Sequence, residues 1–188
     1  MELQFNPDKI ILEHLNSKYP KQMELIQNLE SINNDVDLRF VEKSDLNGNY
    51  IGQVNKREKR EGRGCFISSD GNSFIGYWKD DKKNNKGSLY DKDFNIILEG
   101  NFINGKMNGN GMKILENGTK YEGNFDDDKI NGKGIYTFKN GSKWEGNSSN
   151  GLKDGIGKLT DPQGNVKTVE YKNDILVNND GNENPENE

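Results

Sequence analysis

The stretch YEGNFDDDKINGKGIYTF, from Tyr121 to Phe138, decides the fold of this chain. It holds two strand-like pieces, each with aromatic residues and glycine, around an acidic middle that is rich in Asn and Lys. Alternate residues of a strand point to the same face, so Tyr121, Gly123 and Phe125 lie on one face. Glycine normally weakens a strand, but an aromatic ring can lie flat over a glycine of the neighbouring strand. The stretch therefore predicts a β-hairpin whose rings cover glycine backbone.

The same pattern recurs along the chain every 23 or 24 residues. Each unit starts with an aromatic residue or leucine two positions before a glycine, and a second motif, usually G-x-G, follows 11 or 12 residues later. A turn is then expected, because glycine and asparagine accept a positive φ. Such units need contacts only with their neighbours, which agrees with a hydrophobic content of only 30%. The unit starts are Tyr50, Phe74, Leu98, Tyr121 and Trp144, and the expected turn residues are Gly71, Asn95, Gly118, Gly141 and Gly164.

These motifs resemble the MORN repeat (membrane occupation and recognition nexus), whose pattern is Y-x-G-x-W followed by G-x-G and an aromatic residue. The resemblance is carried by YEGNF and NGKGIYTFKNGSKWEGN and covers about Tyr50 to Tyr171, with departures at Asn85, Leu98 and Ser148. It implies a mainly β fold, an elongated single-layer antiparallel sheet of stacked hairpins. It also implies a scaffold that attaches proteins or membranes, often in cytoskeletal and ciliary assemblies.

Three segments are expected from the pattern along the chain. Residues 1–35 read as two short helices, 6–19 and 20–33, that cap the array; the alternative is that they dock on a partner. Residues 36–177 form the repeat array, with five clear units from Tyr50 and degenerate ends. Residues 178–188 are acidic, and we expect a disordered tail.

Charge and composition exclude several classes of protein. Residues 50–172 carry 21 basic and 17 acidic side chains, a balance too small for general nucleic-acid binding. With one cysteine, Cys65, and one histidine, His14, no disulfide forms within the chain, which fits a reducing compartment. No apolar run reaches the length of a membrane span, and no signal-peptide pattern is present. We expect a soluble, cytoplasmic protein.

The motif search predicts no enzyme. We find no acid–base or nucleophile constellation and no phosphate-binding loop, so no catalytic residue, cofactor or metal is expected. The acidic triplet Asp126–Asp128 has two interpretations, a Ca²⁺ site or a solvated loop, and it lacks the alternating ligands and central glycine of an EF-hand.

One candidate site is the aromatic face of the array. The rings fill the gaps above glycine, and a single layer is expected to leave part of each ring uncovered, as a docking groove for a helical or extended partner segment. The predicted partner-binding residues are Tyr50, Phe66, Phe74, Trp78, Phe102, Tyr121, Phe125, Tyr136, Phe138 and Trp144.

The other candidate site is KREKREGR, expected in one inter-strand loop. It attracts anionic phospholipid head groups on one interpretation and is a solvated loop on the other, because Glu58 and Glu61 interrupt it. The possible lipid-binding residues are Lys56, Arg57, Lys59, Arg60 and Arg63. The leading hypothesis is a non-enzymatic scaffold that binds a partner polypeptide in a cilium, flagellum or other cytoskeletal assembly. The alternative is a peripheral membrane adaptor.

Overall fold

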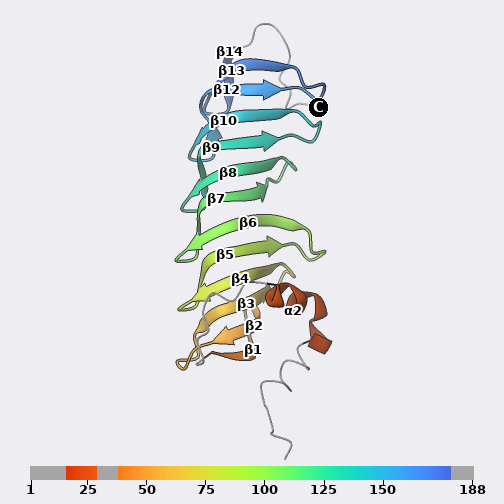
Figure 1. Cartoon of the computed structure of the whole chain (residues 1–188), viewed down its shortest axis with the longest axis vertical. Coiled ribbons are helices and arrows are strands. Elements are labelled where there is room, and N and C mark those ends of the chain that lie inside the picture. Colours follow the sequence, from red (N-terminus) through yellow and green to blue (C-terminus); the bar gives the residue numbers. More distant parts are fainter. Residues whose placement is uncertain (1–15, 29–37, 179–188) are drawn as a thin grey trace, which may run out of the picture. The chain divides into compact units, whose positions relative to one another are not determined.

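The computed structural model describes residues 16–28 and 38–178, which are mainly β (Figure 1). The strands form one antiparallel sheet and follow one another in chain order. The exception is the short β11, which pairs only with β10, so that β10 is followed in the sheet by β12. The predicted mainly β, antiparallel fold is thus confirmed. The elements are α2 (Pro20–Gln27), β1 (Arg39–Asp45), β2 (Gly48–Val54), β3 (Arg60–Ser68), β4 (Ser73–Lys79), β5 (Lys82–Tyr90), β6 (Ile96–Ile103), β7 (Lys106–Ile114), β8 (Lys120–Asp126), β9 (Lys129–Thr137), β10 (Lys143–Ser149), β11 (Leu152–Lys153), β12 (Gly155–Thr160), β13 (Val166–Lys172) and β14 (Ile175–Asn178).

The chain forms two compact units. Unit 1 comprises residues 1–96 and 102–105, and unit 2 comprises residues 97–101 and 106–188. Strands β1 to β5 lie in unit 1, strands β7 to β14 lie in unit 2, and the residues of β6 are divided between the two. Each unit is described by itself below.

Outside the first repeat, the connection inside each hairpin is shorter than the sequence suggested. Strand β8 continues to Asp126 and β9 resumes at Lys129, so the expected acidic loop is a two-residue turn, Asp127–Asp128, with φ of 47° and 70°. Positive φ at both positions matches the right-handed twist of the flanking strands. The strands therefore extend into the polar middle of the motif. A strand can include these residues because the side chains on its solvated face need not be apolar.

A second kind of turn joins one repeat to the next, and one position in it was predicted wrongly. In unit 2, Gly118 takes a φ of 81°. In the second repeat the corresponding residue is Phe94, with a φ of 62°, and not Asn95. The Asp91 carboxylate stabilises this turn by accepting the N–H groups of Asp93 and Asn95 at 2.9 and 2.8 Å. Spacing from the preceding glycine, rather than residue type, decides which residue turns.

The predicted contact between rings and glycines is confirmed. A Cβ atom placed on Gly134 would lie 2.3–2.5 Å from the Tyr121 ring, and one on Gly123 would lie 2.4 Å from the Tyr121 hydroxyl. The ring of Tyr121 lies along its own strand, so that its hydroxyl donates to the carbonyl of Asn124 at 3.1 Å. Since Gly123 and Gly134 are paired directly across β8 and β9, two facing glycines make room for one ring.

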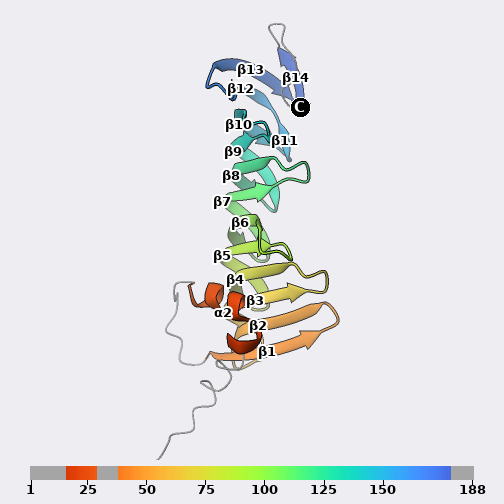
Figure 2. The ribbon, with the colours of Figure 1, turned by 90° about the vertical axis from the view of Figure 1, so that its right-hand side faces the viewer.

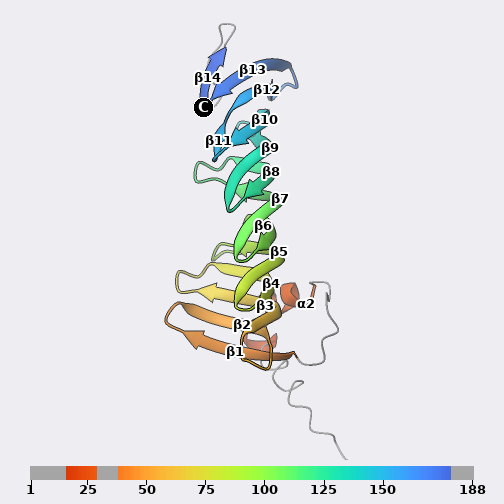
Figure 3. The same cartoon turned by 90° about the vertical axis from the view of Figure 1, so that its left-hand side faces the viewer.

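Helix α2 packs on a face of unit 1, beside β3 and β4 (Figure 2, Figure 3). It begins at Pro20, as predicted, but ends at Gln27 rather than at residue 33. Its fully buried Met23 and Ile26 contact Ile51, Cys65 and Ile75. These three strand residues alternate with ring-bearing and glycine positions, so α2 covers the face opposite the aromatic rings, which we call the outer face.

Several predictions concern residues that the structure does not describe. Residues 16–18 are helical, but most of the predicted helix 6–19, with His14, lies outside the described residues. So do residues 29–37 and the predicted acidic tail beyond residue 178. The start of the array is seen at β1, Arg39, within the degenerate unit expected near Val36.

Candidate functional site

The predicted aromatic face is closed rather than open. Nine of its ten residues are at most 8% exposed, and Phe66 is half-buried. The expectation that every ring keeps an uncovered face is therefore wrong for nine of them, and partner contact through these rings stays a prediction. Within each unit the rings contact one another edge-on or tilted, with centroids 4.8–5.6 Å apart: Tyr50–Trp78, Phe74–Trp78, Phe74–Phe102, Tyr121–Phe125, Tyr121–Tyr136, Tyr136–Trp144 and Trp144–Tyr171.

One repeat position, which sequence reasoning missed, helps to cover the rings. It is the second residue after the two-residue turn of a hairpin. In the first repeat, where the connection is longer, Arg60 occupies this position. The Arg60 guanidinium lies 4.5 Å from the Trp78 ring centroid, and Lys83 Nζ lies 4.5 Å from that of Phe74. Lys153 Nζ lies 4.6 Å from the Tyr171 ring, in a cation–π contact. The spacing of these cations, one repeat or a multiple of it, was the signal for this role.

Lys153 shows how deeply such a cation is enclosed. Its side chain is only 5% exposed and lies 3.9 Å from the Asp174 carboxylate. Burial lowers the pKa of Lys153, and the negative charge of Asp174 opposes that shift. The aliphatic part of the side chain packs over the rings, and the negative faces of the rings attract the ammonium group. The side chain is therefore a structural part of the ring stack.

The third repeat replaces a ring by methionine. This repeat starts at Leu98, which is too short to cover the glycines beside it. Met107 is 1% exposed, and a Cβ on Gly100 or Gly111 would lie 2.4 or 1.9 Å from its terminal methyl carbon. The flexible thioether thus fills the space that an aromatic ring fills elsewhere.

The acidic triplet joins neighbouring hairpins. The N–H of Asp128 donates to the carbonyl of Met107 at 3.0 Å, and the Asp128 carboxylate accepts the Met107 N–H at 2.7 Å. Asp127 pairs with Lys106 at 2.7 Å. Asp81 and Asp174 make the same double contact with residues 60 and 153. Among the described residues, no group of three or more His, Cys, Asp or Glu side chains is arranged to hold a metal ion.

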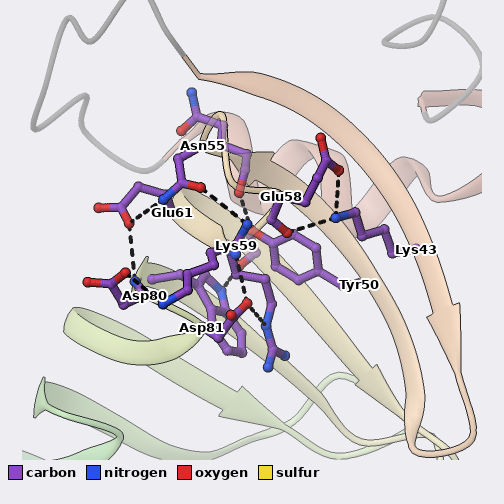
Figure 4. A network of polar contacts seen from close by, with 12 residues as sticks. Lys43, Tyr50, Asn55, Glu58, Lys59, Glu61, Asp80 and Asp81 are labelled. Carbon is purple, nitrogen blue, oxygen red and sulfur yellow. Dashed lines mark hydrogen bonds and ion pairs between the residues drawn. The ribbon is translucent and has the colours of Figure 1, made fainter.

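The basic segment is divided between a loop and a strand, which corrects its placement in one loop. Residues 55–59 form the connection, whereas Arg60 and Arg63 belong to β3. Lys59 pairs with Asp80 at 3.2 Å, and Arg60 pairs with Asp81 at 3.4 Å (Figure 4). Two of the five predicted lipid-binding cations are therefore engaged with the next turn, while Lys56 and Arg57 are exposed.

The loop is held by its own polar contacts as well. Glu58 accepts from Arg39 and from Lys43, the latter at 2.8 Å, and these cations lower the pKa of Glu58 (Figure 4). Glu61 accepts the N–H of Asp80 at 3.1 Å. The acidic residues that interrupt the basic segment thus tie the loop to β1 and to the next turn.

Unit 2 has a groove on its outer face that no motif indicated. The groove has a volume of about 610 Å³, and the backbone of Gly123, Gly134, Gly146 and Gly157 contributes to its lining. One row of side chains, defined by the strand register, runs across it: Glu122, Ile135, Glu145, Lys158 and Thr168. A second row has Asn110, Asn124, Lys133, Asn147 and Ile156. All residues of the two rows are exposed except Asn124, which is half-buried.

The outer faces of the two units differ in chemistry. In unit 1 the positions Ile51, Cys65 and Ile75 are apolar and lie under α2. In unit 2 the same repeat positions hold Met112, Glu122, Ile135, Glu145 and Lys158, so charged residues stand among apolar ones. The sequence signal was the residue beside each repeat glycine, which is apolar at Ile51, Cys65 and Ile75 but charged at Glu122, Glu145 and Lys158.

Comparison with known proteins agrees with this geometry. The sequence model of the MORN repeat matches the chain five times, at residues 50–73, 74–95, 99–120, 121–143 and 144–166. A search of curated proteins gave no match. The described helical residues contain no segment that is long and apolar enough to cross a bilayer.

Proposed function

Because the chain belongs to the MORN repeat family, we propose that it is a non-enzymatic scaffold that binds a partner polypeptide on its repeat sheet. MORN repeats are in general protein- or membrane-binding scaffold repeats, and the family is non-catalytic. The observation that carries the proposal is the open groove on the outer face of unit 2, which holds exposed aliphatic and charged side chains together. A surface built by repetition suits the binding of an extended or helical segment better than chemistry at one point.

We further propose that the protein acts in the cytoplasm, in a ciliary, flagellar or other cytoskeletal assembly. The support is the family's general role as a scaffold. The test is to express the tagged full chain in its source cells, separate detergent-soluble and cytoskeletal fractions, and purify the chain from each. We expect it in the cytoskeletal fraction with one recurrent polypeptide in near-stoichiometric amount. A chain that is wholly soluble and monomeric would contradict both parts of the proposal.

A peripheral membrane adaptor is the second candidate, and the exposure of Lys56 and Arg57 is the observation that favours it. Against it, Lys59 and Arg60 already pair with Asp80 and Asp81, and stable membrane attachment usually needs two signals. In co-sedimentation with phosphatidylserine vesicles we expect no more binding than with neutral vesicles. Binding that falls with salt and disappears on Lys56→Ala with Arg57→Ala would favour the membrane adaptor instead.

A further inference from the structure

We propose that the outer face of unit 2 binds a partner α-helix that presents a basic side chain at every seventh position, with an aliphatic side chain midway between. This inference rests on the proposed scaffold function and names the chemistry of its partner. The contact row is Met112, Glu122, Ile135, Glu145 and Lys158, one residue from each of β7, β8, β9, β10 and β12.

Unit 1 shows that the outer face of this repeat accepts a helix. Met23 and Ile26 of α2 are fully buried against Ile51, Cys65 and Ile75, which occupy β2, β3 and β4 in direct register. The row in unit 2 occupies the same repeat positions. Two helix residues three positions apart are thus buried against one row of strand residues, and no helix of the described residues covers the row in unit 2.

The row in unit 2 selects a different helix. Acidic and apolar residues alternate from strand to strand: Met112, Glu122, Ile135, Glu145. Ile135 is 38% exposed, so an aliphatic partner would bury apolar area there. A purely apolar helix such as the stripe of α2 would leave two carboxylates desolvated, which is unfavourable. A helix with bases opposite Glu122 and Glu145 avoids that cost.

The spacing favours a helix over an extended segment. Neighbouring strands lie about 4.8 Å apart, so Glu122 and Glu145, two strands apart, are roughly 10 Å apart. Seven helical residues rise about 10.5 Å, and residues three or four apart on a helix lie on one face. In an extended chain, residues about 10 Å apart are three positions apart and point to opposite faces. Only a helix presents a basic, an aliphatic and a second basic side chain to successive residues of the row.

The existing charges leave room for such a partner. Glu122 pairs with Lys120 at 2.8 Å, but both side chains are more than 40% exposed, and exposed pairs contribute little. Glu145 lies opposite Lys158 across β10 and β12. Opposite Lys158 we expect an acidic residue of the partner helix, three or four positions beyond the basic residue that faces Glu145. This last requirement fixes the direction of the helix across the strands.

The test uses two designed helical peptides of about three heptads and the full chain. One peptide has lysine at every seventh position with leucine midway, and the other has glutamate in place of lysine. Fluorescence anisotropy should show that the basic peptide binds more tightly. Glu122→Gln with Glu145→Gln should weaken that binding roughly tenfold, since two exposed pairs are lost. Glu116→Gln with Asp93→Asn, at two exposed turn residues, is the charge-matched control and should change nothing.

A charge reversal sharpens the test. The variant Glu122→Lys with Glu145→Lys should prefer the acidic peptide, which general damage to the fold would not produce. Circular dichroism and urea midpoints check that each variant is folded. Equal affinity for both peptides, no binding by either, or no effect of the glutamine variant would overturn the proposal. Self-association that the glutamine variant abolishes would assign the face to a second copy of the chain and would also overturn it.

The two levels of proposal fail separately. If a polypeptide recovered from cells is retained equally by the wild-type chain and by the glutamine variant, the scaffold function stands and this helix site does not. If the wild-type chain recovers no partner at all, the scaffold function itself fails.

Discussion

At the residue scale, the contact between one ring and two glycines determines how a thin sheet is held together. Gly134→Ala should lower the free energy of unfolding by about 1–3 kcal/mol, because the new Cβ would lie within 2.5 Å of the Tyr121 ring. Urea unfolding measures the loss. In a Tyr121→Ala background the same glycine substitution should cost much less, since the ring that it meets is gone. Equal costs in the two backgrounds would contradict the contact.

Met107 gives a second test at this scale. Met107→Ala should cost about 2–5 kcal/mol, because a buried side chain over Gly100 and Gly111 is lost, and Met107→Leu should cost under about 1.5 kcal/mol. Leu98→Tyr alone should destabilise the fold, as its ring would compete with Met107 for the same space. Adding Met107→Ala to Leu98→Tyr should recover stability. If the double variant were less stable than both single variants, Met107 would not be the replacement for a ring.

At the element scale, the two-residue turns join each hairpin to the preceding one. Asp128→Gly keeps a residue suited to a φ of 70° but removes the carboxylate that accepts the Met107 N–H. We expect a loss of about 1.5–3 kcal/mol in unfolding free energy, the range for a hydrogen bond to a charged group. Gly105 and Gly151 occupy this position naturally and keep only the backbone bond, at 2.8 Å each.

Asp126→Ala is the matched control for that substitution. It removes a neighbouring exposed carboxylate and should change stability by less than about 0.5 kcal/mol. A similar loss for both variants would mean that the acidic triplet acts through its charge rather than through the bond to Met107.

The packing of α2 on the sheet predicts a dependence on alkaline pH. Burial under Met23 and Ile26 raises the pKa of the Cys65 thiol from 9.0 to about 12. The folded state therefore keeps the proton that the unfolded chain releases, so stability is fully present below pH 9 and is lost as pH rises toward 12. Between pH 9 and 10 this group should remove about 1 kcal/mol. Urea titrations should show that Cys65→Ala makes this loss smaller by that amount; an unchanged pH slope would contradict the burial.

At the scale of the whole molecule, the features that the sequence could predict are those that depend on residues close together in the chain. The repeat period, the hairpins and the ring over Gly134 follow from alternation within strands and from turn residues. Burial of the rings did not follow, because it depends on Arg60, Lys83 and Lys153, which come from the return strands. The turn at Phe94 was missed because spacing there overrides residue type.

The outer face was harder still to predict from sequence. A charged residue such as Glu122 or Lys158 reads as an ordinary solvated strand position, and only the register shows that such residues form one row across neighbouring strands. Likewise, the apolar stripe of α2 predicted packing but not which face of unit 1 it covers. Long-range register and helix placement are tertiary properties that a repeat pattern alone does not contain.

Partner binding on the outer face of unit 2 is tested most directly by site-specific photocross-linking in cells, with a benzophenone amino acid at position 135. A second chain carries it at position 139, in an exposed turn. We predict one recurrent cross-linked polypeptide from position 135 that is absent from position 139 and lost on Glu122→Gln with Glu145→Gln. Cross-linking from position 139 alone, or from neither position, would contradict the claim that this face holds the partner.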